Sequence, residues 1–324
     1  MQRRGRLPGL PAAVVALALG GGGLLVAAMS EAAPPPSSAP AASAADDAYT
    51  KEIEQYRRDR ERRLRSERGW LTLVGLFWLA DGPNRFGSDP RAEIVLPAGS
   101  APAQAGTVTL RDGGVSLRVA DGVAATINGK AVTTAELRPD DPGPPDVVMI
   151  GSVSMQVIKR SGRLGIRLKD SNSPARRQFA GLRWFPVNAS YRVTARFVPH
   201  EHPVSITVPS AVGPAQTLSS PGAAVFTIEG HQLRLDAVME EPSSTELFFI
   251  FRDKTTGSET YGAGRFLYTP LPRDGQVVLD FNKAFSPPCA FTVYATCPLP
   301  PPQNRLPIRI PAGELALPSH AGVP

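Results

Sequence analysis

Residues 246–268 read ELFFIFRDKTTGSETYGAGRFLY, and this stretch indicates most directly how the chain folds. An apolar run at 246–253 is followed by four turn-forming residues at 254–257 and then by a second run at 260–268. Two short runs around a turn that contains glycine are typical of a β-hairpin. The stretch therefore predicts two antiparallel strands that pair with each other.

The same pattern continues on the N-terminal side. Residues 153–160 and 163–169 flank the two-residue turn Ser161-Gly162, which predicts another hairpin. Between residues 191 and 197, apolar side chains alternate with Arg and Thr, the period of a half-buried strand. No second long amphipathic helix follows the N-terminal region. We therefore expect an all-β body, made of one sandwich followed by a second antiparallel sandwich or barrel.

The composition agrees with a folded, turn-rich protein. The chain has 324 residues, of which 42% are hydrophobic and 20% are charged, so global disorder is excluded. The 34 prolines and 30 glycines favour many turns and short strands over a helical bundle. The net charge of +6 is modest and does not by itself indicate a partner.

The first residues predict export. Three arginines up to Arg6 precede an uncharged stretch at 7–30, and small residues follow it. This order is typical of a signal peptide at 1–33 and of a periplasmic or extracellular protein, for which we expect no nucleic-acid partner. The alternative is an uncleaved segment that anchors the chain in the inner membrane. Residues 34–48 are rich in Pro, Ser and Ala and predict a disordered linker.

Residues 49–69 predict one charged helix that lies against the body. Gly69 is a plausible stop signal for this helix. Oppositely charged residues at a spacing of four support it, namely Glu54–Arg58, Asp59–Arg63 and Glu61–Arg65.

Residues 70–170 form the next expected domain. It contains a Gly-rich turn at 85–89, a short apolar run at 94–96 and an Asn-Gly loop at 128–130. In this order, the segment resembles a forkhead-associated β-sandwich. Phosphothreonine readers of that family carry an Arg after the first glycine and a Ser-x-x-His loop. Here Ser88 follows Gly87 and no His precedes His200, so the resemblance implies the fold and not phosphopeptide binding.

Several longer stretches from residue 69 onward carry a second resemblance. They include GWLTLVGLFWL at 69–79, GIRLKD at 165–170, FRDKTTG at 251–257, TYGAGRFL at 260–267 and DFNKA at 280–284. In these stretches the chain is similar to a largely bacterial family, domain of unknown function 1684. The resemblance implies family membership and brings no reaction with it.

The domain expected at 171–324 contains a cluster of polar residues. If the hairpin closes tightly, Tyr261 and Arg265 point among aromatic side chains, where an arginine needs a carboxylate or an anionic ligand. One interpretation is an Arg–Asp clamp that fixes strand pairing, and the other is a polar ligand pocket in a barrel mouth. The ligand-binding candidates are Arg252, Asp253, Tyr261, Arg265, Asp280, Asn282, Asn304 and Glu314.

These residues support two hypotheses about function. The first is an exported protein that binds a small ligand or an envelope partner without a cofactor. The alternative is a hydrolase or lyase that uses Tyr261, Arg265, Asp280 and Glu314, and whether the chain is an enzyme stays open. Cations alternate with apolar residues at 163–169, so this strand would also present a basic face suited to weak contact with an anionic membrane surface.

Cys289 and Cys297 lie in a Pro-rich tail, and an exported protein favours a disulfide between them. Structural free thiols, a metal site and a nucleophilic cysteine are the alternatives. His200-Glu201-His202 sits between two prolines at a turn and is expected in a solvated loop, so we expect no metal.

Overall fold

The computed structural model describes residues 44–213 and 215–318. The export signal predicted at 1–33, and the part of the predicted linker up to residue 43, lie outside the described residues. Among the described residues, no helix combines the length and the apolar character needed to cross a lipid bilayer.

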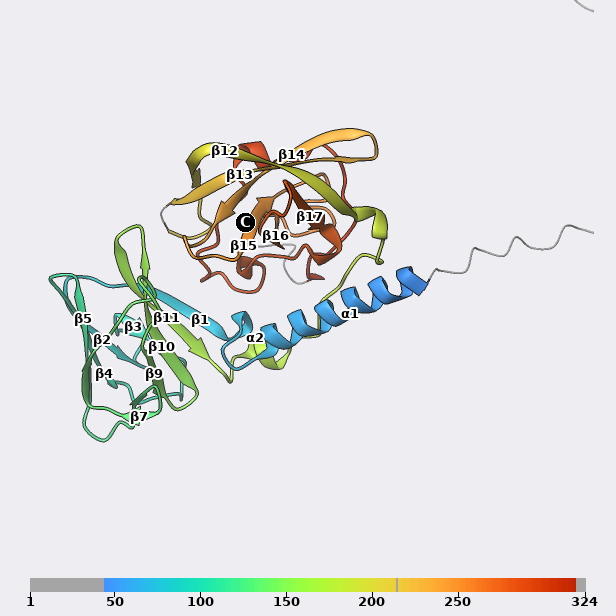
Figure 1. Cartoon of the computed structure of the whole chain (residues 1–324). Helices are drawn as coiled ribbons and strands as arrows, with labels where there is room; N and C mark the ends of the chain where they lie inside the picture. The colour runs from blue at the N-terminus through green and yellow to red at the C-terminus, as the bar shows by residue number, and fades with distance from the viewer. Residues whose placement is uncertain (1–43, 214, 319–324) are drawn as a thin grey trace, which may run out of the picture. The chain divides into compact units, whose positions relative to one another are not determined.

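Helix α1 (Ala44–Arg65) is the one long helix of the described chain (Figure 1). It begins at Ala44 rather than at residue 49, and Asp47 in its first turn suits the positive end of the helix dipole. Two of the expected ion pairs form, Arg58–Glu54 at 3.9 Å and Arg65–Glu61 at 2.9 Å. Asp59 pairs with Arg62 at 2.6 Å instead of with Arg63, so the predicted Asp59–Arg63 pair is wrong. Three-apart spacing also brings side chains together on a helix.

Two sheets face each other in the first half of the body (Figure 1). One sheet has the order β1-β11-β10-β9-β6-β7, and the other has the order β3-β2-β4-β5-β8. Their bounds are β1 (Leu73–Trp78), β2 (Gly82–Gly87), β3 (Ile94–Val95), β4 (Gly106–Arg111), β5 (Gly114–Val119), β6 (Thr126–Ile127), β7 (Lys130–Ala131), β8 (Thr134–Glu136), β9 (Val147–Ile150), β10 (Val153–Arg160) and β11 (Arg163–Asp170). Phe86 and Val108 from one sheet share a buried core with Val148 and Ile166 from the other, which makes a sandwich.

The hairpin predicted at Ser161-Gly162 is confirmed, since β10 and β11 pair antiparallel across it from Arg160–Arg163 to Val153–Asp170. Ser161 and Gly162 both have positive φ, 46° and 79°. A two-residue turn with positive φ at both positions follows the right-handed twist of its strands.

The second half contains one six-stranded sheet in the order β16-β15-β14-β13-β12-β17. Its strands are β12 (Arg192–Val208), β13 (Gln216–Ile228), β14 (His231–Met239), β15 (Glu246–Phe251), β16 (Arg265–Pro270) and β17 (Gln276–Asp280). The Thr269 hydroxyl of β16 donates to the Val278 carbonyl of β17 at 2.7 Å, so the two outer strands meet and the sheet nearly closes into a barrel. The expected all-β architecture with one N-terminal helix is confirmed.

Short helical turns connect the strands. They are η1 (Trp70–Thr72), α2 (Pro174–Arg177), η2 (Ala189–Tyr191), η3 (Phe281–Lys283), η4 (Pro288–Ala290) and η5 (Pro302–Asn304). The tail after β17 is otherwise irregular, yet Ile308, Ile310 and Ala312 are buried in the same core as the barrel strands. The proline-rich tail therefore belongs to the packed body.

The hairpin predicted at 246–268 closes through a longer connection than predicted. Strands β15 and β16 pair in a register that puts Phe251 opposite Arg265. Residues 252–264 form a long connection instead of a four-residue turn, and Asp253 holds it by accepting from the Thr255 hydroxyl at 2.7 Å. The strand pairing was predicted, but Tyr261 lies in the connection and not in the strand.

Candidate functional site

Arg265 and Asp253 form an ion pair inside the barrel. Arg265 Nη2 lies 3.2 Å from Asp253 Oδ2, and both side chains are fully buried. The Arg265 guanidinium also donates to the carbonyls of Ile310 and Ala312, and Asp253 accepts from the Ile310 amide at 2.6 Å. The pair thus ties the C-terminal tail to β16, which is the clamp interpretation.

Glu314 is held by helix α1. Its buried carboxylate accepts from Arg60 Nε at 2.8 Å, and Arg60 Nη2 donates to the Ser286 carbonyl at 2.8 Å. The Arg60 guanidinium also lies over the Phe285 ring, 4.2 Å from its centroid. Helix α1 is therefore docked through a charged pair and does not merely lean on the body.

The remaining candidates lie in three further contacts. Asp280 accepts from the Tyr49 hydroxyl at 2.8 Å, and Asn282 donates to the same hydroxyl at 2.9 Å. Asn304 donates to the carbonyls of Asp236 and Ile250 at 2.9 and 3.0 Å. The amide of Arg252 donates to the Asn304 carbonyl, and the Tyr261 hydroxyl donates to the Cys289 carbonyl at 2.8 Å.

The eight candidates do not line one open pocket in the structure, and ligand binding by them stays a prediction. Asp253, Arg265, Asp280, Asn282, Asn304 and Glu314 are all buried, and their contacts join the tail and α1 to the barrel. Tyr261, Arg265, Asp280 and Glu314 lie in four separate networks. The geometry therefore gives no support to the hydrolase or lyase that would use them together.

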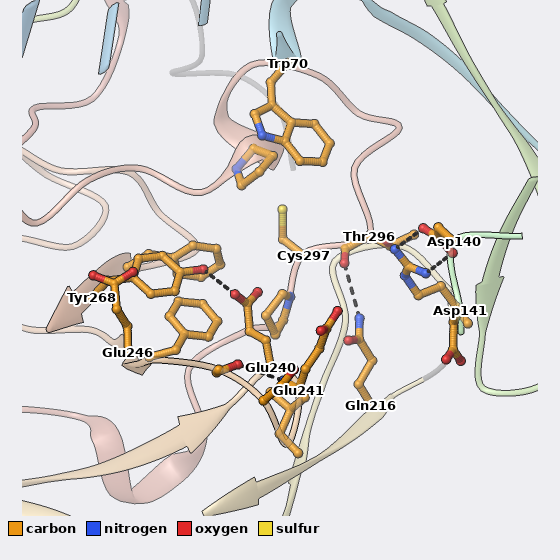
Figure 2. A pocket seen from close by; sticks show the side chains of 18 of the residues that line it. Trp70, Asp140, Asp141, Gln216, Glu240, Glu241, Glu246, Tyr268, Thr296 and Cys297 are labelled. Atoms are coloured by element: carbon orange, nitrogen blue, oxygen red, sulfur yellow. Dashed lines mark hydrogen bonds and ion pairs between the residues drawn. The ribbon is translucent and has the colours of Figure 1, made fainter. Parts of the chain in front are cut away.

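A large cleft lies elsewhere (Figure 2). None of the eight candidates is among the residues that line it. Its volume is about 1780 Å³, which exceeds that of a usual small-ligand site. Its walls come from α1, η1, the β10–β11 hairpin, the start of β13, the β14–β15 connection, β16 and the tail around Cys297. Segments far apart in sequence thus build this cavity.

One wall of the cleft is cationic. Arg160 makes a bidentate contact with Asp140, with both nitrogen–oxygen distances at 2.9 Å, and Asp140 also accepts from the Lys159 amide. Arg167 Nη1 lies 3.9 Å from the same carboxylate, too far for a hydrogen bond. The guanidinium groups of Arg160 and Arg167 thus both face the Asp140 carboxylate. Arg160 binds both of its oxygen atoms, and Arg167 makes no hydrogen bond to it.

Arg167 is the least compensated charge on this wall. Its side chain is 9% exposed, and its buried Nε has no hydrogen-bond partner among the described residues. Trp70 covers the guanidinium, with its ring centroid 5.5 Å away. Burial, together with the positive charge of Arg160, lowers the pKa of Arg167 to about 10. A second anion in the cleft would favour the charged form of Arg167.

The opposite wall is acidic and aromatic. Glu240, Glu241 and Glu246 line it, and the Tyr268 hydroxyl donates to Glu240 at 3.0 Å (Figure 2). Glu240 is accessible from the cleft, but its desolvation in the concave wall and the charges of Glu241 and Glu246 raise its pKa. The ring of Phe248 stacks on Tyr268, with centroids 4.6 Å apart. This wall suits a polar or positively charged group over an aromatic surface.

The basic strand face predicted at 163–169 is largely covered. Arg163 stacks over Trp78 at 4.7 Å and stays exposed, whereas Arg167 is buried in the cleft wall. Lys169 donates to the Arg68 carbonyl at 2.6 Å. The strand therefore exposes fewer unpaired positive charges to solvent than the alternation of basic and apolar residues at 163–169 predicts.

The two cysteines are close together and are free thiols in the structure. The Cys289 amide donates to Cys297 Sγ at 3.1 Å, and Cys297 lines the cleft. The disulfide stays a prediction. Among the described residues, no group of three His, Cys, Asp or Glu side chains is arranged to hold a metal ion.

Residues 177–315 match the family described as "Protein of unknown function (DUF1684)". This chain belongs to the DUF1684 family. The matched span covers the barrel and the tail, and the stretches at 69–79 and 165–170 lie outside it. The solution structure of an uncharacterised protein from Haloarcula marismortui is 34% identical over 44% of this chain and 80% of its own, with a TM-score of 0.38.

Solved forkhead-associated domains also resemble part of this DUF1684 protein. The FHA domain of FhaA is 18% identical over 29% of this chain and 86% of its own, with a TM-score of 0.21. The FHA-2 domain of an ABC transporter from Mycobacterium tuberculosis is 28% identical over 29% of this chain and 81% of its own, with a TM-score of 0.22. None of the curated proteins matches the chain. The DUF1684 family carries no named activity, so function has to be argued from the cleft.

Sequence reasoning missed the cleft residues for a physical reason. The alternation in β11 predicted that Arg167 faces outward, but its side chain is buried and Trp70 covers it. The one feature of the sequence that indicates the cationic wall is the cluster of basic residues at 159–167. Glu240 and Tyr268 carry no local pattern that separates them from ordinary surface residues.

Proposed function

We propose that this protein binds a small ligand in the cleft, with an anionic group of the ligand held at Arg167. The observation that carries the proposal is Arg167, which lines the cleft while Arg160 occupies the Asp140 carboxylate. Asp141 also lines the cleft, but among the described residues it pairs with neither arginine. Leaving a buried charge without a partner is costly, and a carboxylate or phosphate group would relieve that cost. A guanidinium is well suited to both groups.

Trp70 and the acidic wall narrow the class of ligand. Trp70 lies against Arg167 and can pack on the apolar part of a bound molecule. Glu240, Glu241 and Glu246 would repel a second negative charge at the far wall. The cleft therefore favours a zwitterionic ligand, such as a short peptide, over a polyanion.

The binding test uses the fluorescence of Trp70. Glycylglycine, inorganic phosphate and citrate are titrated separately into the full chain, and saturable changes in tryptophan emission are recorded. We expect glycylglycine to bind more tightly than citrate, because only the dipeptide offers a positive group to the acidic wall. Replacing Trp78 and Trp184 by Phe leaves Trp70 as the single reporter among the three tryptophans.

Two variants decide whether the signal belongs to the proposed site. Arg167→Gln should abolish binding, because it removes the buried cation. Arg163→Gln lies on the same strand, is exposed and is outside the cleft, so binding should persist. If none of the three probes gives a saturable signal that depends on Arg167, the proposal fails.

We further propose that the mature protein works outside the cytoplasm, in the cell envelope or beyond it. The support is the basic, then apolar, then small-residue order of the first 33 residues. N-terminal sequencing of the protein isolated from its native envelope should start near Ala33 or Pro34. A chain that still begins at Met1 and stays with membranes after carbonate washing would make it an anchored protein instead.

A further inference from the structure

Cys289 and Cys297 form a close pair at the edge of the cleft, of which only Cys297 lines the cleft. The Cys289 amide donates to Cys297 Sγ at 3.1 Å, which brings the Cys297 sulfur against the backbone of Cys289. The chain contains only these two cysteines, so each thiol has a single partner within the molecule. Their separation by seven residues in sequence is closed by a folded loop.

The ends of this loop are fixed while its tip is exposed. Phe291 is buried, and the Thr292 hydroxyl donates to the Leu73 carbonyl at 3.0 Å. Val293 and Tyr294 are 56% and 38% exposed. This packing anchors the loop, and the Cys289 amide holds Cys297 Sγ without a covalent bond between the two cysteines.

The two thiols have different surroundings. Cys289 is partly exposed, and hydrogen bonding from the Cys297 thiol lowers its pKa. Cys297 is buried, and its role as donor to Cys289, together with its burial, raises its pKa. The Tyr261 hydroxyl donates to the Cys289 carbonyl at 2.8 Å and fixes the backbone at that position. A partly exposed cysteine beside a buried one is the arrangement of an attacking and a resolving cysteine.

We propose that Cys289 and Cys297 are a thiol–disulfide exchange site, with Cys289 as the attacking and Cys297 as the resolving residue. The co-reactant is a low-molecular-weight disulfide. The Cys289 thiolate attacks one sulfur of that disulfide, the external S–S bond breaks, and one thiolate leaves and takes a proton from solvent. Cys297 then loses its proton and attacks the Cys289 sulfur, which releases the second small thiol. The protein pair loses two electrons, and the small disulfide gains them.

The test uses glutathione disulfide and the intact mass of the full chain. The reduced protein is mixed with this reagent, quenched with acid and analysed. We expect one intramolecular disulfide and two molecules of reduced glutathione released per chain. Oxidised protein should return to the dithiol when the ratio of reduced to oxidised glutathione is raised. Failure to reverse at any ratio would show a static bridge and overturn the proposal.

Two single variants separate the roles of the cysteines. Cys297→Ser should stop at the mixed disulfide on Cys289, whereas Cys289→Ser should form roughly tenfold less adduct because the remaining thiol is buried. Circular dichroism checks that each variant is folded, and the reversibility of the wild type stands without either variant. Equal adduct on both variants, or a wild type that carries two separate glutathione groups, would contradict the assignment.

Discussion

Arg265 Nη2 lies 3.2 Å from Asp253 Oδ2, and both side chains are completely buried. These residues join the last barrel hairpin to the C-terminal tail, because Arg265 also donates to the Ile310 carbonyl and Asp253 accepts from the Ile310 amide. The other polar atoms of the pair bind protein groups, and only Arg265 Nε has no hydrogen-bond partner among the described residues. Such hydrogen bonds offset the cost of burying the two charges. The pair therefore acts as a structural lock between two segments distant in sequence.

Removing one partner of this lock should cost much of the protein's stability. We expect Asp253→Asn to lower the free energy of unfolding by about 3–5 kcal/mol, because Arg265 would be left as an uncompensated buried charge. Urea unfolding followed by circular dichroism measures the change. Arg309→Met, which breaks an exposed pair with Glu259, is the control and should cost less than about 1 kcal/mol. Similar losses in the two variants would show that the buried pair is not a lock.

Arg60 should be needed to dock helix α1. Replacing it by Met leaves the buried Glu314 without its cation, so we expect a loss of about 3–5 kcal/mol and faster amide hydrogen exchange along the helix. Arg62→Met on the same helix removes an arginine whose side chain is 72% exposed, and exchange should stay unchanged. Equal protection of α1 in both variants would argue against docking through Arg60.

Gly264 is needed for the turn that leads into β16. Its φ is +95°, and an added Cβ would lie 2.5 Å from Pro300 Cγ and 2.6 Å from the Phe251 carbonyl oxygen. Gly264→Ala should therefore destabilise the fold by more than about 1 kcal/mol. Gly262→Ala is the matched control two positions away, because nothing lies within 4 Å of its added Cβ. Thermal unfolding of both variants checks the difference, and equal melting temperatures would contradict it.

Lys169 should make stability depend on pH. Burial, followed by the nearby charges of Arg167 and Arg68, lowers the pKa of Lys169 from 10.5 to about 8 in the folded state. Between these two values the unfolded chain binds more protons, so this residue makes stability rise with pH across the window. Unfolding free energies measured at several pH values should show that rise, and Lys169→Met should remove it. The same slope in the variant would assign it to another group.

The sequence predicted the parts of the fold that local rules control. Ser161-Gly162 marked the β10–β11 hairpin because positive φ at both positions is a local requirement. The connection between β15 and β16 was predicted as a four-residue turn, because nothing local shows that Asp253 organises a longer loop. The sequence analysis placed Arg265 among aromatic side chains, and the register of β15 with β16 does bring it opposite Phe251.

The candidate site was less accessible from sequence. Polar residues of the barrel were identified correctly as a set that needs partners, but the partners are protein groups rather than a ligand. Arg167 and Trp70 meet because η1 packs beside β11, and that contact depends on tertiary packing. A sequence pattern can identify an arginine that needs a negatively charged partner. It cannot show that a neighbouring carboxylate, here Asp140, is already bound by another arginine.

The most direct test of the account is the Nε resonance of Arg167 in a proton–nitrogen correlation spectrum. This atom is buried and has no hydrogen-bond partner among the described residues, and the guanidinium that carries it lines the cleft. The resonance is assigned by its loss in Arg167→Gln, and glycylglycine is then added to saturation. Ligand binding at the cation wall predicts a saturable shift of the Arg167 resonance, while the Nε resonance of the exposed Arg163 stays in place. An unchanged Arg167 resonance, or an equal shift of both arginines, would contradict binding at the cation wall.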